Sequence, residues 1–491
     1  MWRVANRCGV GGHAREAHGV WAGRRWVLGR ASEPDEMFDR PLESLNWEAQ
    51  ASRWASPHLC MKPLAQKDAP GKQESESEVH MATSAVQPVR FMALDMHKHY
   101  VMVGAVNKAQ EVLLRPRKFT WPEFDRWHKQ HIGPGDVIVI EASGNAWHVH
   151  DQLTAQGAIV HVANPLLVKW IGAAPVKTDP HDTLKLAKLL AAGLLPTVWV
   201  PPAPVRALRT LIGQRQRWIK QRTQARNRLQ GVLQDHNLRP PEGDLFAPDQ
   251  RGWWLALDVS PAERLLVAQD LLALDQLAPL IDQVETAIQG QSTCEPWANQ
   301  VPYLIQQTGI GWLTAMTLLA AIGDISRFAH PCQLVGYAGL GARIHASGET
   351  HNTGGITKQG RRELRAAMVE AAWVAVMHSA FWKAKFARLA RRIGEAKAIV
   401  AIARQMLVSV WYLWHNRTVD RHSDACTIAH KLWTWAEQGG KTMRHGLSCS
   451  HFVRYQLDQL GIGQELTELR YGSHVYRLPP AGSDASLPAA N

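Results

Sequence analysis

The stretch RFMALDMHKHYVMVGAV, residues 90–106, gives the first indication of the fold in the first half of the chain. It reads as two apolar strands, Arg90–Met96 and Tyr100–Val106, joined by a tight polar turn. A third strand pattern follows at Glu111–Phe119. The nearly all-apolar run Asp136–Ser143 is typical of a strand at the buried centre of a sheet.

Helix and strand patterns alternate after the third strand. Helices are predicted at 120–130, 144–157, 165–172 and 180–193, and further strands at 158–165 and 197–201. Three hairpin-joined strands followed by such an alternation predict an α/β unit with a mixed sheet. With 491 residues, the chain is long enough for two to four domains.

Carboxylates lie at special positions in this unit. Asp95 ends one apolar strand and Glu141 ends another, and burying an unpaired charge is costly. Asp179 and Asp182 are three residues apart at the start of a helix, so they share one face. If the four converge, they could hold two Mg²⁺ ions (or Mn²⁺), which prefer oxygen ligands and promote in-line attack at phosphorus.

Each of these acids also has a simpler interpretation. Asp179 and Asp182 around Pro180 make a good helix start, and Asp95 could end a strand in a turn. Glu141 has the weakest alternative, because four apolar residues precede it. Only the set of four, in this context of strands and helix, favours catalysis.

The other residues with metal-binding chemistry give no clear site. The pairs His97/His99 and His148/His150 have suitable spacing, but no third ligand is evident, so we interpret them as ordinary polar positions. The six cysteines include no C-x-x-C pair, which indicates neither a zinc site nor a disulfide framework, and reduced thiols are expected.

A long basic helix pattern opens the second half of the chain. Residues 205–229 include eight basic residues and no acid, which favours a polyanionic partner over a merely solvated face. Apolar residues near heptad spacing predict pairing with another helix, in the same chain or in a dimer, and 240–297 is the expected return arm. The predicted nucleic-acid contacts are Arg206, Arg209, Arg215, Arg217, Lys220, Arg222, Arg226 and Arg228.

Two glycine-containing stretches are further candidates. Gly309 and Gly311 resemble the turn of a helix-hairpin-helix motif that approaches a phosphate, although a tight turn before a core helix is equally consistent. Residues 336–365 predict a glycine-rich loop that presents the Ser347 hydroxyl. Most Ser-Gly pairs lie in turns. From the residues alone, a turn is therefore the more probable role of Ser347, and a nucleophile is the less probable one. The predicted phosphate contacts around it are Arg343, Lys358, Arg361 and Arg365.

Composition bears on partners and location. The formal net charge of +12 favours a polyanion, either nucleic acid or an anionic membrane. The N-terminus lacks a secretory pattern, and apolar runs such as Ile310–Ile322 are too short to span a bilayer, so we expect a cytoplasmic, nucleoid-associated protein without a membrane partner. Residues 1–88 are predicted to be disordered or weakly ordered, with translation starting at Met1 or Met81, and the last residues, DASLPAAN, are predicted to be disordered.

These segments, in this order, resemble the DEDD transposase family of insertion sequences, some members of which are bridge-RNA-guided recombinases. The resemblance covers about residues 90–414. It is carried by ALDMHK around Asp95, VIEASG around Glu141, VKTDPHDTLKLAKLL around Asp179 and Asp182, TGIGWLTAMTLLAAIGD, RFAHPCQLVGYAGL, and the ASG…GGITKQGRRELR run with Ser347. One departure is Thr357, which stands where the family usually has a serine.

The resemblance implies an RNase H-like (RuvC-like) mixed-sheet domain at 89–202. A coiled-coil connector at 203–300 and a mainly helical, serine-bearing transposase domain at 301–420 follow, with a C-terminal extension at 421–491. It also implies that Asp95, Glu141, Asp179 and Asp182 bind metal and that Ser347 forms a phosphoserine link with DNA. The implied partners are DNA, a structured noncoding RNA in some members, and further copies of the chain, as a dimer or tetramer.

Three hypotheses follow for the function. The first is a metal-dependent serine transposase or recombinase that moves its own element. The second is a structure-selective nuclease that uses the carboxylates and water without a covalent step. The third is a nonenzymatic nucleic-acid-binding protein derived from a transposase.

Overall fold

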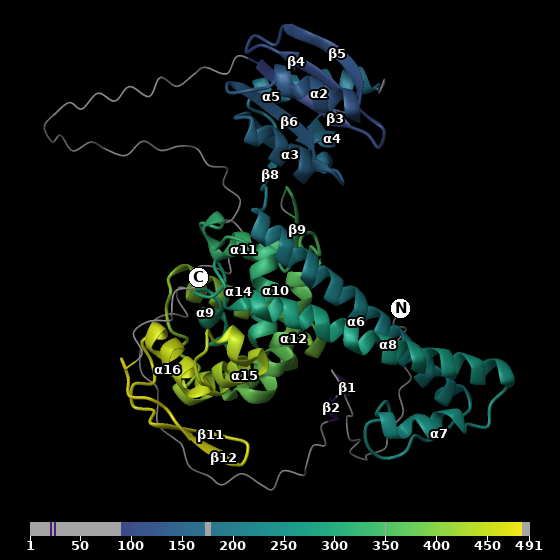
Figure 1. Cartoon of the computed structure of the whole chain (residues 1–491), viewed down its shortest axis with the longest axis vertical. Coiled ribbons are helices and arrows are strands. Elements are labelled where there is room, and N and C mark those ends of the chain that lie inside the picture. The colour runs from purple at the N-terminus through teal and green to yellow at the C-terminus, as the bar shows by residue number, and fades with distance from the viewer. Residues whose placement is uncertain (1–19, 22–23, 26–89, 172–177, 349, 484–491) are drawn as a thin grey trace, which may run out of the picture. The chain divides into compact units, whose positions relative to one another are not determined.

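The structure, a computed structural model, describes residues 20–21, 24–25, 90–171, 178–348 and 350–483. They divide into a sheet unit that ends at Pro202 and a helical unit that begins at Ala203. The predicted fold class, a mixed α/β sheet followed by a mainly helical region, is confirmed (Figure 1). The expectations for the termini lie outside the described residues, except for a short antiparallel pair, β1 (Val20–Trp21) and β2 (Arg24–Arg25).

The sheet unit contains six strands in the order β5-β4-β3-β6-β7-β8. Their bounds are β3 Arg90–Met96, β4 Tyr100–Val106, β5 Val112–Thr120, β6 Asp136–Glu141, β7 Ile159–Ala163 and β8 Thr197–Val198. The first three pair antiparallel, as their hairpin pattern predicts, whereas β6 pairs parallel with both β3 and β7. The mixed sheet predicted from the sequence is therefore confirmed.

Helices cover both faces of this sheet. They are α2 (Trp121–His131), α3 (Ala146–Ala155), α4 (Pro165–Ile171) and α5 (Asp179–Ala191). Because side chains alternate along a strand, Met92 and Leu94 pack into the core under α2 and α3. Phe91 and Ala93 point the other way and pack against residues of α5.

An ion pair joins the first residues of the two central parallel strands. The Arg90 Nε and Nη2 atoms each lie 2.8 Å from an oxygen of the Asp136 carboxylate, and these residues are register partners of β3 and β6. Asp136 is buried and also accepts a hydrogen bond from the Gly133 amide at 3.0 Å. The pair fixes which residues of β3 and β6 lie opposite one another.

The helical unit begins with the predicted helical pair. Helix α6 (Ala203–Asp235) runs antiparallel to α8 (Pro261–Ser292), since Arg215 pairs with Glu285 while Arg228 pairs with Asp270 (Figure 1). The remaining helices are α7 Arg251–Leu255, α9 Val301–Ile305, α10 Trp312–Ile322, α11 Pro331–Tyr337, α12 Arg362–His378, α13 Ala380–Ile393, α14 Glu395–His415, α15 Ala425–Met443 and α16 Cys449–Leu460. Two hairpins complete the unit: β9 (Ala342–Ser347) with β10 (Thr350–Ile356), and β11 (Glu468–Tyr471) with β12 (His474–Arg477).

Helix α14 differs from the expectation that every apolar run is too short to span a bilayer. By length and composition alone, its 21 residues are long and apolar enough to cross a membrane. Half of the most apolar part of the helix is, however, buried inside the structure. The helix contacts α9, α11, α12 and α13, and Ile402, Met406 and Val410 are fully buried there. It therefore serves as the central helix of this unit.

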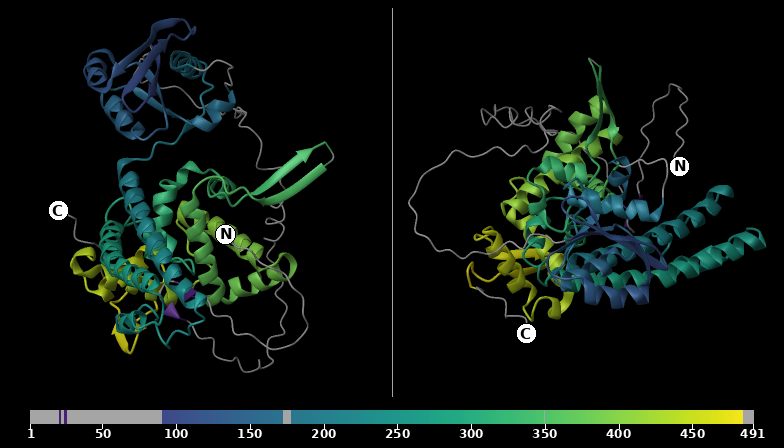
Figure 2. Two further views of the ribbon diagram at one scale, coloured as in Figure 1. Left: turned by 90° about the vertical axis from the view of Figure 1, so that its right-hand side faces the viewer. Right: turned by 90° about the horizontal axis from the view of Figure 1, so that it is seen from above.

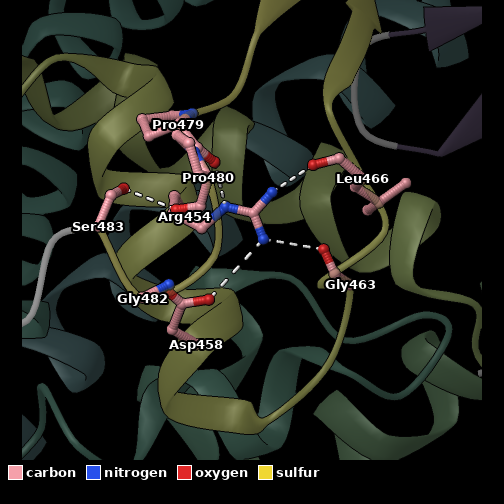
Figure 3. A network of polar contacts seen from close by, with 8 residues as sticks. All are labelled: Arg454, Asp458, Gly463, Leu466, Pro479, Pro480, Gly482 and Ser483. Carbon is pink, nitrogen blue, oxygen red and sulfur yellow. Dashed lines mark hydrogen bonds and ion pairs between the residues drawn. The ribbon is translucent and has the colours of Figure 1, made fainter.

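A buried arginine organises the C-terminal segment (Figure 3). Arg454, on α16, is fully buried, and its guanidinium donates hydrogen bonds to the carbonyl oxygens of Gly463, Leu466 and Pro479. Its Nη1 also lies 3.7 Å from the Asp458 carboxylate. One side chain thus connects the helix to the chain before β11 and after β12.

We expect Arg90→Met to destabilise the sheet unit by about 2 kcal/mol, because it leaves the buried Asp136 carboxylate without its cation. The value lies below that for a fully buried pair, since Arg90 retains 33% of its side-chain exposure. Urea denaturation followed by circular dichroism measures the change. Arg115→Met, at an exposed position on β5, is the matched control, and an equal loss in both variants contradicts a special role for the Arg90–Asp136 pair.

Candidate active site

The strand register brings two of the predicted carboxylates to one edge of the sheet. The last register pair of β3 and β6 is Leu94 with Ile140, so Asp95 and Glu141 are the next residues on neighbouring strands. Both continue the alternation that points Ala93 and Val139 towards α5. Helix α5 begins with Asp179 and carries Asp182 in its first turn. All four predicted acids therefore belong to the α5 side of the sheet.

The side chains of Asp95, His97 and Asp179 form a compact cluster. Their ligand atoms all lie within 4.8 Å of one another. The His97 Nε2 atom lies 3.2 Å from Oδ2 of Asp95 and 3.5 Å from Oδ2 of Asp179. The Tyr100 hydroxyl donates to Asp179 at 2.7 Å, and the Tyr100 ring stacks on that of His97 with centroids 4.4 Å apart.

His97 is a residue that the sequence interpretation missed. It is not an ordinary polar position, because its ring contacts two of the four predicted acids. The signal was present in the spacing: His97 comes two residues after Asp95, and the alternation of side chains along β3, continued one residue past its end at Met96, places His97 on the side of Asp95. His99 and His148 are exposed, and His150 lies 3.1 Å from Asp151, so the structure does not bring these three into the cluster.

Burial is the main influence on the pKa of Asp95, and neighbouring charges modify it. Burial raises the pKa of this carboxyl above its ordinary value, the nearby His97 lowers it, and the charges of Asp179 and Asp182 raise it further. The net result is a raised pKa. Asp182 is thus electrostatically coupled to the cluster, although its own oxygens are not among the clustered ligand atoms.

The cluster has the chemistry of a divalent-cation site. Two carboxylates and one imidazole are ligands that Mg²⁺ or Mn²⁺ can share, with the carboxylates preferred by both ions. A bound cation would also relieve the repulsion between Asp95 and its acidic neighbours. The residues present therefore fit the metal that the sequence predicts.

Ser347 lies on a β-hairpin, which corrects the prediction of a glycine-rich loop. It is the exposed last residue of β9, and it pairs with Thr350 across the turn. Gly348 in that turn has φ +55°, a conformation that favours glycine. Gly354 and Gly355 lie where the register of the two strands shifts. The glycines therefore shape a turn and a bulge, and Figure 2 shows the hairpin projecting from its helical surroundings.

The base of this hairpin is held by two close backbone crossings. A Cβ atom on Gly339, which has φ +67°, would lie 2.2 Å from the Gln359 carbonyl oxygen. A Cβ atom on Gly360, with φ +100°, would lie 2.2 Å from the carbonyl oxygen of Tyr337. These contacts join the end of α11 to the start of α12, so the exposed serine rises from a fixed base.

The four basic residues predicted around Ser347 all belong to this hairpin or its base. Arg343 and Lys358 are exposed. The Arg361 Nε donates to the Tyr337 hydroxyl at 3.1 Å, and Arg365 Nη1 donates to the Ala338 carbonyl at 2.9 Å. Two of the four therefore stabilise the α11–α12 junction, and the other two remain open to solvent.

The basic residues of α6 divide in a similar way. Arg209 donates to the Ala320 and Ala321 carbonyls at the end of α10, and burial lowers its pKa to about 10. Arg215 and Arg228 pair with acids of α8, and the Arg226 guanidinium lies over the ring of Phe246. Arg206 and Arg222 are half-buried, whereas Arg217 and Lys220 are exposed. Much of the predicted cationic face thus contacts the protein itself.

The Gly309–Gly311 turn packs closely against α12. Gly309 has φ +91°, and a Cβ atom there would lie 2.1 Å from the Ala371 carbonyl oxygen. Ile310 is fully buried, and Gly311 is the N-cap of α10. Close packing alone thus explains why residue 309 is a glycine. At Gly311, by contrast, an added Cβ atom would have no neighbouring atom within 4 Å.

Two transposase family models match this chain, one in its first half and one in its second half. A DEDD transposase family model, described as Transposase, matches residues 92–238. A model described as Transposase IS116/IS110/IS902 family matches residues 302–387.

Individual relatives agree with these matches. A transposase for insertion sequence element IS1111A from Coxiella burnetii is 25% identical over 56% of this chain and 77% of its own length. The pilin gene-inverting protein of Moraxella bovis is 28% identical over 58% of this chain and 82% of its own. The transposase for insertion sequence element IS1328 from Yersinia enterocolitica is 22% identical over 72% of this chain and 98% of its own.

We expect His97→Ala to raise the pKa of Asp95 further, because it removes both the charge and the hydrogen bond that lower it. Carboxyl ¹³C NMR titration of metal-free protein measures the shift. His99→Ala, which changes an exposed neighbour, serves as the control. An unchanged Asp95 titration in His97→Ala would contradict the contact between the two side chains.

Proposed function

The chain belongs to the DEDD transposase family of insertion sequences and is a DNA transposase or recombinase, and on this basis we propose that it cuts and rejoins the DNA of its own element through a phosphoserine intermediate. The observation that carries the proposal is the meeting of Asp95, His97 and Asp179 at the ends of β3 and α5. Glu141, on the adjacent parallel strand, faces the same side of the sheet.

The carboxylates supply the electrostatic part of the proposed reaction. Asp95, Glu141, Asp179 and Asp182 are the residues that would hold Mg²⁺ or Mn²⁺, whose chemistry when bound is to stabilise charge at phosphorus and favour attack by a hydroxyl. Tyr100, through its hydrogen bond to Asp179, fixes the orientation of one of these carboxylates. His97 contacts Asp95 and so orients a second of the four carboxylates.

Ser347 supplies the nucleophile. Its Oγ forms a bond to phosphorus of a DNA phosphodiester and loses its proton, while the bond from phosphorus to the leaving strand oxygen breaks and that oxygen gains a proton. Rejoining is the reverse reaction with a different strand end, so no external energy source is required. Arg343, which is exposed on β9 of the hairpin, and Lys358, which is exposed just after β10, are the proposed contacts to the phosphate.

The remaining partners follow from this chemistry. The carboxylates and Ser347 belong to different units, so the proposal requires them to meet on DNA, within one protomer or between protomers of a dimer or tetramer. A structured noncoding RNA is the proposed guide, as in some relatives of the family. We place the reaction in the cytoplasm, on the nucleoid.

Ser347→Ala should abolish strand joining and the covalent protein–DNA adduct, because the nucleophile is lost. A radiolabelled element end, incubated with protein, flanking RNA and Mg²⁺, reveals the adduct on a denaturing gel. Ser473→Ala, an exposed serine in the turn of the β11–β12 hairpin, should retain both. If Ser347→Ala still cuts DNA and leaves hydrolysed ends, the nuclease hypothesis is favoured instead.

Asp95→Asn and Asp179→Asn should each weaken Mn²⁺ binding by at least about tenfold, since each removes a charged ligand. Isothermal titration calorimetry with Mn²⁺ alone measures the affinity without DNA or turnover. Asp258→Asn changes an exposed acid in the helical unit and should bind like the parent. Unchanged affinity in both site variants would contradict a metal role for the cluster.

A further inference from the structure

The exposed residues of helix α13 are all cations or alanines. Lys383, Arg388, Arg391 and Arg392 are exposed on it, and its other exposed residues are Ala380, Ala384 and Ala387. At 100° per residue these seven positions fall within one half of the helix. The 14-residue helix contains no acidic residue. This surface, which we call the α13 basic face, lies outside the residues assigned above to catalysis.

The other residues of the helix account for its packing. Trp382 is buried, the Phe386 ring contacts that of Trp373 on α12, and the Phe381 ring stacks on His422 with centroids 3.7 Å apart. The helix also packs along α14. The packing of α13 therefore depends on its aromatic residues and not on the basic face.

The charges on this face are unfavourable for the isolated protein. Arg388 lies three and four residues before Arg391 and Arg392, spacings at which like charges repel on a helix. Lys383 is in the first turn, where the helix dipole favours an acid and none is present. Among the described residues, none of these four cations forms an ion pair. Only Arg391 and Arg392, in the last turn, are well placed for the dipole.

We propose that the α13 basic face binds the phosphate backbone of a nucleic-acid double helix. Alanines between the cations leave room for the backbone to approach the helix surface. The helix is about 21 Å long, which spans several successive phosphates of a duplex strand. Binding would replace cation–cation repulsion with cation–phosphate attraction and release condensed counterions.

The composition of the face favours a double helix over a single strand. Proteins that bind single strands stack bases on exposed aromatic rings. Of the three aromatic residues of α13, Trp382 is buried, and the half-buried rings of Phe381 and Phe386 are already in contact with His422 and Trp373. Cations alone contact the backbone and do not read bases, so the binding is expected to be independent of sequence.

The test is the salt dependence of binding by the full chain. Lys383, Arg388, Arg391 and Arg392 are all changed to Gln in a Ser347→Ala background, so that strand joining does not enter the measurement. The matched control changes four exposed cations elsewhere, Arg421, Lys441, Arg470 and Arg477, to Gln. Fluorescence anisotropy with a 30-base-pair duplex of unrelated sequence gives log Kd against log salt, and thermal melting verifies that both variants fold.

With duplex DNA, we expect the slope to fall by about 2 to 4 in the α13 variant and by less than about 1 in the control. The same loss with duplex RNA alone would support the proposal and identify an RNA helix as the partner. Equal slopes in both variants would overturn it, since net charge alone would then explain binding. Loss of binding to phosphatidylserine vesicles without loss of duplex binding would also overturn it. The inference rests on the proposed function only for its nucleic-acid partner, and its failure leaves the role of Ser347 unaffected.

Discussion

The ion pair between Arg90 and Asp136 is the interaction on which the geometry of the acidic cluster depends. It joins the first residues of the two central parallel strands, and both strands then run to a carboxylate, Asp95 or Glu141. Because side chains alternate, a slip of one residue would turn Glu141 towards α2 and α3 while Asp95 still faced α5. Precision at one end of the sheet thus comes from a charged pair at the other end, about 17 Å away at the usual rise of a strand.

The two candidate parts of the active site differ in burial and in charge. In the sheet unit, acids are crowded and partly buried, which costs stability, and this cost is reduced by His97 and by the Tyr100 hydroxyl. In the helical unit, the serine is exposed on a hairpin that stands on a close backbone junction. The first arrangement concentrates charge, whereas the second presents one hydroxyl without burying it.

Much of the sheet unit could be predicted because its strands are apolar, alternate in polarity and are separated by clear turns. The predicted Asp95 and Asp179 do meet, since strand ends and a helix start converge by topology. His97 was missed because a spacing of two residues was weighed as a metal-ligand pattern with His99 and not with Asp95. The hairpin at Ser347 differs from the predicted loop because its glycines lie in a turn and at a register shift, which a count of glycines does not distinguish from a loop. The contacts of Arg209 and Arg215 with the protein depend on α10 and α8, which are distant in sequence, so no local pattern reveals them.

The buried guanidinium of Arg454 has a consequence for synthesis of the protein on the ribosome. Its acceptors come from Gly463, Leu466 and Pro479, so the helix that carries it is made before any of them. Until Pro479 has left the exit tunnel, the Arg454 Nε atom has no protein acceptor and must stay hydrated, so α16 cannot reach its final environment. A nonsense mutation between Leu466 and Pro479 would therefore leave the Nε atom of this guanidinium without its acceptor, and such a product should be a substrate for cellular proteases.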